Sequence, residues 1–110
     1  MAADAGGFTA LYRDYLADAW QSYRSMLENV ETRRIEDVRA KAHYLRSSSL
    51  IMGAHGVARL AARLEEAAIA GNGEPFDSLL NEVKIALQEV QAELTERLGS
   101  SVLPAGETAA

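Results

Sequence analysis

The sequence predicts an all-α protein, an antiparallel up-and-down four-helix bundle. Apolar residues recur at alternating spacings of three and four along four separate stretches, which is the period of an amphipathic helix. The stretches are joined by short connections, and no stretch resembles a strand. We therefore divide the 110 residues into a flexible lead at 1–7, one bundle domain at 8–99 and a disordered tail at 100–110.

A change of phase separates the first two helices. The pattern becomes helical from Thr9, and we expect this helix to end within Glu31–Arg34. Neither Gly nor Pro marks that break, but the apolar stripe restarts in a new phase at Ile35. The second helix is predicted from about Ile35 to Met52. The stripe of the first helix comprises Tyr12, Leu16, Ala19, Tyr23, Met26 and Val30.

Glycine and proline mark the later boundaries. Two glycines predict a turn over 53–56, with a continuous helix through Gly53 as the alternative. The third helix closes at a second turn over 71–73, and Pro75 suits the first turn of the fourth. Gly99 ends the fourth helix. The stripes of these two helices are Val57, Leu60, Ala61, Leu64 and Ala68, then Leu80, Val83, Leu87, Val90, Leu94 and Leu98.

Composition excludes several classes of protein. A net charge of -5 argues against a nucleic-acid binder, whose footprint is a basic excess. The chain has no cysteine, so neither a disulfide nor a thiolate metal site can form. The N-terminus lacks the basic start and apolar core of a signal peptide, and no apolar run is long enough to span a membrane. We expect a cytoplasmic protein that stands alone, since it begins at Met1 and has one domain.

The second helix presents a histidine to solvent. At about 100° per residue, Val38, Leu45, Ser49 and Met52 share its apolar side, with Ala42 at the edge. His43 points the opposite way. Arg39, Arg46, Ser47 and Leu50 lie within about 60° of it. We interpret this as an imidazole flanked by two guanidinium groups, with an exposed apolar side chain in line. By contrast, His55, Trp20, the tyrosines and Glu65 are interpreted as structural residues, with Glu65 a helix-surface charge as the alternative.

The surroundings of His43 favour phosphoryl transfer over other chemistry. Ser47 is near enough to touch the imidazole, but no carboxylate lies within a turn on the same face to orient it, so a serine hydrolase is weakly supported. Metal binding is poorly supported because the chain has only two histidines and no ligand pair. An imidazole beside a guanidinium can attack an anion whose oxygens the guanidinium holds. Phosphoryl transfer needs mostly such positioning and charge neutralisation.

These residues carry a resemblance to a known family. The run Ala42-His43-x-Leu45-Arg46-Ser47-Ser48-Ser49-x-x-x-Gly53-Ala54, with Leu64-Glu65 on the next helix, resembles the histidine-containing phosphotransfer (HPt) domain. The motif covers some 25 residues and the four-helix plan about 90. The resemblance implies a carrier in a phosphorelay, without small-molecule turnover. His43 would accept a phosphoryl group from the aspartyl phosphate of a receiver domain and pass it reversibly to another receiver.

The resemblance also implies roles for neighbouring residues. Arg46 stands where the family has a basic residue and would stabilise the phosphoryl oxygens. Ser47 stands where the family has a glycine that leaves room for the receiver, and it adds a methylene and a hydroxyl that can bond back to a helix carbonyl. Arg39, Ser47 and Leu50 would contact the partner, together with apolar residues of the first helix.

Partners and cofactors follow from the same resemblance. The expected partners are response-regulator receiver domains and a hybrid sensor histidine kinase, bound by a monomer that has no cofactor or metal of its own. The divalent metal would belong to the receiver. Positive charge at Arg33, Arg34 and Lys41 would steer an acidic receiver pocket, or else the first two form only a solvated helix junction. The alternative function is a helical adaptor that binds a receiver or kinase without carrying phosphate.

Overall fold

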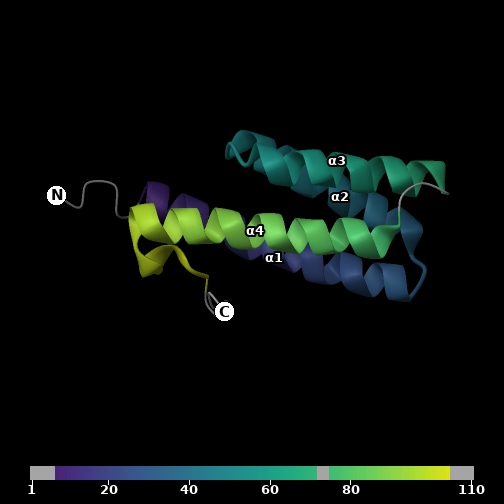
Figure 1. The fold of residues 1–110 in the computed structure, drawn as a ribbon, viewed down its shortest axis with the longest axis horizontal. Coiled ribbons are helices and arrows are strands. Elements are labelled where there is room, and N and C mark those ends of the chain that lie inside the picture. Colours follow the sequence, from purple (N-terminus) through teal and green to yellow (C-terminus); the bar gives the residue numbers. More distant parts are fainter. Residues whose placement is uncertain (1–6, 72–74, 105–110) are drawn as a thin grey trace.

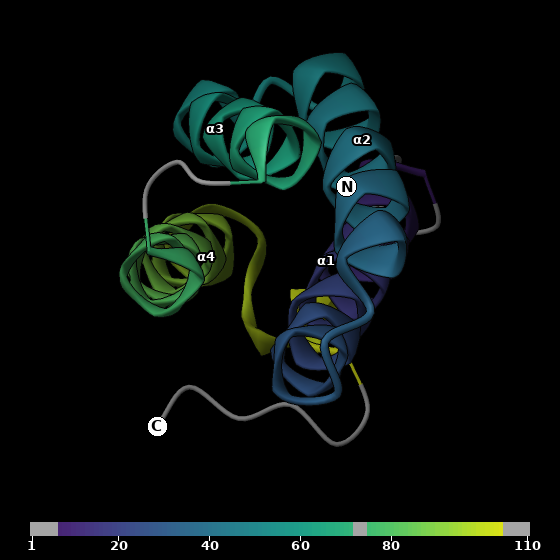
Figure 2. The same cartoon turned by 90° about the vertical axis from the view of Figure 1, so that its right-hand side faces the viewer.

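The computed structural model describes residues 7–71 and 75–104 and contains four α-helices and one 3-10 turn. The elements are α1 (Phe8–Glu31), α2 (Ile35–Ile51), α3 (His55–Ala70), α4 (Phe76–Leu98) and η1 (Ser100–Val102). Each helix packs against the helices before and after it, and α4 closes the bundle against α1 (Figure 2). Among the described residues α2 and α4 do not contact each other, so they lie on a diagonal. This confirms the predicted four-helix bundle.

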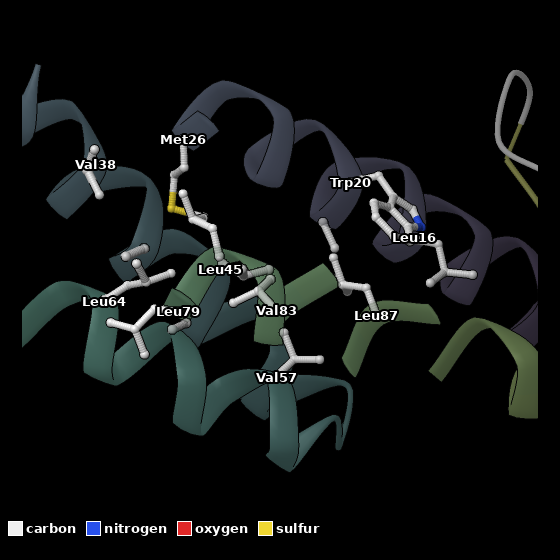
Figure 3. Close-up of a cluster of buried hydrophobic side chains, with 14 of the residues drawn as sticks. Leu16, Trp20, Met26, Val38, Leu45, Val57, Leu64, Leu79, Val83 and Leu87 are labelled. Atoms are coloured by element: carbon white, nitrogen blue, oxygen red, sulfur yellow. The ribbon is translucent and has the colours of Figure 1, made fainter. Parts of the chain in front are cut away.

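The apolar stripes meet along the bundle axis (Figure 3). Leu16, Leu45 and Leu64 are each fully buried, and each such side chain contributes about 1.5–3 kcal/mol when removed from water. Two polar pairs are buried among them. Trp20 Nε1 donates to Gln91 Oε1 at 2.9 Å, and the Tyr15 and Ser49 hydroxyls share a 2.7 Å hydrogen bond. Burial raises the pKa of Tyr15, which the bond to Ser49 partly offsets.

The C-terminal ends of α1 and α2 are closed by the same pattern of backbone hydrogen bonds. After α1, the Arg34 amide donates to Asn29 O and the Arg33 amide to Val30 O. After α2, the Ala54 amide donates to Ser49 O and the Gly53 amide to Leu50 O. This Schellman arrangement needs a left-handed residue just past the helix, and here Gly53 has φ 80° and Arg33 has φ 60°. Arg33 thus does what glycine usually does, which explains a break without a glycine.

The turn between α2 and α3 is shorter than predicted. The helix restarts at His55, so Gly56 lies inside α3 and Gly53 alone supplies the turn conformation. Pro75 caps α4 from outside and is not within its first turn, while Gly71 ends α3 with φ 77°. The rest of the predicted turn, residues 72 and 73, lies outside the described residues.

The prediction of a disordered tail from residue 100 is wrong for residues 100–104. Gly99 ends α4 as predicted, but η1 follows and packs against both α1 and α4. Val102 and Pro104 are buried and Arg13 Nη1 donates to Ser101 O at 3.1 Å, so apolar burial and one side-chain-to-backbone hydrogen bond order this segment. It sits where α1 and α4 extend past the α2–α3 turn (Figure 1). Residues 1–6 and 105–110 of the predicted lead and tail lie outside the described residues.

Candidate functional site

His43 projects outward from α2, as the helical period predicts. Val38, Ala42, Leu45 and Ser49 are all fully buried on the opposite side of that helix. The His43 side chain keeps 54% of its surface exposed. The packing of α2 against the core therefore leaves an imidazole that another molecule can reach.

A carboxylate from the neighbouring helix contacts this imidazole. His43 Nδ1 lies 2.9 Å from Oε2 of Glu65 on α3, whose side chain is only 15% exposed. An ionised carboxylate can only accept a hydrogen bond, so Nδ1 carries the hydrogen and donates it. The lone pair of the neutral ring then lies on Nε2. Glu65 thus selects the tautomer of His43 whose free nitrogen is Nε2.

Arg46 completes a cluster of three side chains. Its Nε lies 3.2 Å from Glu65 Oε1, and its Nη2 lies 3.3 Å from His43 Nδ1. The Nε atom is buried without a hydrogen-bond partner among the described residues, so its contact with Glu65 is an ion pair only. Because Nδ1 already donates to Glu65, it cannot also accept a hydrogen from Arg46. The Arg46 side chain is 37% exposed and holds a positive charge beside the ring.

The alternative interpretation of Glu65, as a helix-surface charge, is wrong. Its side chain is mostly buried and contacts both predicted site residues. The spacing rule used for α2 considers only carboxylates on the same helix, and Glu65 comes from α3. The signal was present as the Leu64-Glu65 pair of the family resemblance, but its role depends on how α2 and α3 pack.

Of the other predicted contact residues, Ser47 and Leu50 are exposed and Arg39 is partly buried. The Arg39 guanidinium forms a hydrogen-bonded ion pair with Glu36 one turn earlier. That hydrogen bond raises the pKa of Arg39 and lowers the pKa of Glu36. Ser47 is exposed and makes no hydrogen bond to any residue that the structure describes. The expected bond back to a helix carbonyl is made instead by Ser48, whose Oγ donates to Leu45 O at 3.2 Å.

Apolar side chains gather at the end of α2 beyond His43. Leu50 is 50% exposed and Ile51 is 83% exposed. Leu11 of α1 is also half exposed and lines a groove with Ile51. Of these three residues only Leu11 lies on α1, where the sequence predicted apolar contact residues without naming them. Tyr44, next to His43, donates to Asp18 Oδ2 at 3.2 Å, and the Asp18 charge raises the pKa of Tyr44.

Two arginines and a histidine that the sequence singled out lie outside the cluster at His43. Arg34 lies 3.8 Å from Asp37, and Arg33 occupies the helix-ending conformation, so both have local roles at the α1–α2 junction. His55 is the first residue of α3 and is exposed. Within residues 7–71 and 75–104, no group of three or more acidic or histidine side chains is arranged to hold a metal ion. None of the described helices is long and apolar enough to cross a membrane.

Comparison with known proteins adds one finding. A family model described as "Hpt domain" matches residues 10–93, which includes all three side chains of the cluster and most of the four helices. No curated protein and no solved structure matches the chain.

Proposed function

The chain belongs to the Hpt domain family, and on that premise we propose that His43 carries a phosphoryl group between receiver domains. The family implies histidine phosphotransfer in a phosphorelay and interaction with receiver domains in general. The observation that carries the proposal for this residue is the 2.9 Å contact between His43 Nδ1 and Glu65 Oε2. This contact holds the exposed imidazole in the tautomer that leaves Nε2 free for a partner.

The proposed step balances without any proton transfer. The Nε2 lone pair attacks the phosphorus of an aspartyl phosphate, the N–P bond forms and the bond from phosphorus to the carboxyl oxygen breaks. The aspartate leaves as a carboxylate, and the ring becomes a phosphorylated imidazolium that still carries hydrogen on Nδ1. Transfer to the next receiver reverses these bond changes. The divalent metal of the step would belong to the receiver.

Glu65 supports this step electrostatically. The ring gains positive charge as the N–P bond forms, and the carboxylate at Nδ1 stabilises that charge through a hydrogen bond that is stronger between ionised groups. Glu65 also forms an ion pair with Arg46, whose Nε lies 3.2 Å from Glu65 Oε1. A positioning carboxylate of this kind holds the neutral ring in the tautomer whose free nitrogen is Nε2 and aims that nitrogen at the partner.

Arg46 would act on the phosphoryl group. Its charge lies beside the imidazole, and a guanidinium offers several N–H donors in a planar arrangement that suits phosphoryl oxygens. The negative charge spread over those oxygens in the transition state is stabilised by donors that are already in place. Because Arg46 pairs with Glu65 before the reaction, its side chain needs little further ordering.

Docking would use the exposed face around His43. Leu50 and Ile51 offer apolar surface, and Arg39 and Ser47 lie on the same side of α2. The donor would be the receiver domain of a hybrid sensor histidine kinase and the acceptor a response regulator. Both would bind the same face, because a single imidazole serves both steps.

Label transfer tests the proposal. Wild-type protein incubated with a phosphorylated receiver domain is expected to gain a label that is labile in acid and stable in alkali, as an N–P bond requires. His43→Gln is expected to take up none, and His55→Gln, which removes the other imidazole, is expected still to carry the label at the end point of the reaction. Equal labelling of His43→Gln and wild type would contradict the assignment.

Two other functions are outcomes of the same experiment. A non-catalytic adaptor would bind the receiver without forming phosphohistidine, and binding would survive His43→Gln. A serine hydrolase would need the Ser47 hydroxyl to donate to His43 Nε2, and within the described residues that hydroxyl makes no hydrogen bond. The hydrolase hypothesis would require that the wild type hydrolyses a model ester and that Ser47→Ala does not.

A further inference from the structure

A groove leads away from the His43 cluster between α2 and α3. It has a volume of about 460 Å³ and is lined by Arg46, Leu50, His55, Ala58, Arg59 and Ala62. Arg46 belongs both to this groove and to the cluster at His43. The groove is therefore continuous with the proposed phosphoryl site and does not form a separate pocket.

The chemistry of the groove suits an acidic partner segment. Its floor is apolar, made by Leu50 from α2 and two alanines of α3, Ala58 and Ala62. Arg59 stands on its rim, is exposed and makes no ion pair with any residue that the structure describes. His55 lies one turn before Arg59 on the same helix. A cationic rim over an apolar floor complements a carboxylate-bearing segment with some apolar contact.

The groove on the other side of α2 has the opposite charge. It has a volume of about 190 Å³ and includes Leu11, Ile51, Asp14 and Asp18 among its lining residues. The ridge of α2 that carries His43 is thus bordered by a cationic groove toward α3 and an acidic groove toward α1. A partner with separated charges can satisfy both grooves in only one orientation.

We propose that the α2–α3 groove seats an acidic segment of the docking receiver domain, and that Arg59 is a specificity-determining residue that fixes the orientation of the receiver. This inference rests on the proposed function. Arg59 takes no part in the chemistry at His43. It attracts the partner's carboxylates and, together with the acidic groove on the α1 side, repels the reversed orientation. The proposal also gives His55 a place on a docking surface, where sequence reasoning assigned it to a turn.

The test compares two charge reversals of equal size. Arg59→Glu places a negative charge in the groove. Lys84→Glu makes the same change on α4, which does not contact α2 anywhere in the described chain. Each variant is first phosphorylated with phosphoramidate, a small donor that needs no docking surface, and then mixed with a receiver domain that accepts label from the wild type. Arg59→Gln, which removes the charge without reversing it, guards against a folding defect.

The expected results separate docking from chemistry. Arg59→Glu is expected to lower the second-order rate constant for transfer to the receiver about tenfold at low salt, within the range that electrostatic steering provides. Arg59→Gln is expected to fall between it and the wild type, and Lys84→Glu to match the wild type. At about 0.5 M salt the variants should converge, because the screening length is then only a few ångströms. Uptake from phosphoramidate should be the same in all four proteins.

Other outcomes would contradict the role of Arg59, the occupant of the groove or the proposed function. Equal transfer by Arg59→Glu and Lys84→Glu overturns the role of Arg59. Loss of phosphoramidate uptake in Arg59→Glu overturns a docking role in favour of a chemical one. Self-association of the wild type that Arg59→Glu abolishes assigns the groove to the acidic α4 of a second copy and overturns the receiver assignment. If the wild type takes up no phosphoryl group, or passes it to no receiver in a panel, the proposed function itself fails.

Discussion

The two sides of α2 are each built from residues three or four positions apart, and they have different roles. On the inner side Val38, Ala42, Leu45 and Ser49 are completely buried. On the outer side His43, Ser47 and Leu50 are exposed, and Arg46 lies at the border with α3. The inner side fixes the rotation of the helix about its axis, and that rotation sets the direction of the imidazole. Stability and function can therefore be disturbed separately in a single element.

The largest effect should come from an inner residue. Leu45→Ala removes a fully buried side chain at the centre of the bundle (Figure 3) and should lower the free energy of unfolding by about 2–5 kcal/mol. Leu50→Ala is the matched control, since it makes the same change on the half-exposed outer side and should alter stability by less than about 0.5 kcal/mol. Urea denaturation measures both. Similar losses in the two variants would contradict the division of α2 into two sides.

On the outer side, Arg46→Ala should affect transfer more than folding. It removes the charge beside the imidazole and should slow phosphoryl transfer about 10- to 100-fold, at or below the usual loss of one preorganised donor because the site is partly open to water. The lifetime of the phosphohistidine should shorten as well. Lys84→Ala is the control, since it removes a cation from α4, which does not contact α2 in the described chain. Unchanged kinetics in both directions would remove Arg46 from the mechanism.

Ser49 tests a polar contact on the inner side. Ser49→Ala removes the partner of the Tyr15 hydroxyl, which is left buried without a hydrogen bond, and should cost about 1–3 kcal/mol of stability. Ser48→Ala, one residue earlier, removes only a bond to a backbone carbonyl and should cost less. Thermal unfolding of the two variants decides. If Ser49→Ala is as stable as the wild type, the Tyr15–Ser49 pair is not a stabilising contact.

Glu65 links the site to the neighbouring helix. Glu65→Gln keeps an acceptor for Nδ1 but loses the charge, and a neutral hydrogen bond is weaker than an ionic one by roughly 1–1.5 kcal/mol. We expect transfer to slow about tenfold, which is that difference expressed as a rate. Glu66→Gln, the adjacent exposed carboxylate, is the matched control. Equal rates in both variants would show that His43 does not need the charge at Nδ1.

Local periodicity predicted much of this molecule. The four helices and the outward direction of His43 depend on residues three and four positions apart, so the sequence carries them directly. The burial of Gln91 could not be predicted from apolar periodicity, because Gln91 is polar. The apolar stripe of α4 predicted Val90 and Leu94 as core residues and passed over Gln91, which is buried because the Trp20 N–H needs an acceptor across the bundle.

The features that were missed depend on contacts between elements. Glu65 meets His43 across 22 residues of chain, and only the packing of α3 on α2 brings them together. Val102 belongs to a segment without periodicity, so its composition predicted disorder although its side chain is fully buried. Arg33 adopts a conformation usually left to glycine, and no propensity rule would place it there.

The smallest effect is expected at Ser47, and it sharpens the contrast between the two sides. The hydroxyl makes no hydrogen bond within the described structure, so Ser47→Gly removes no contact from the folded protein. The free energy of unfolding should fall by about 0.5 kcal/mol, because glycine has a lower helix propensity than serine. Ser47→Ala is the matched control for the hydroxyl alone. Receiver affinity, measured by titration calorimetry, should stay the same or improve in Ser47→Gly, because a smaller residue leaves more room beside His43. A large loss of affinity shared by both variants would instead make the serine hydroxyl a direct contact with the partner, and the outer side of α2 would then include a polar docking residue next to the imidazole.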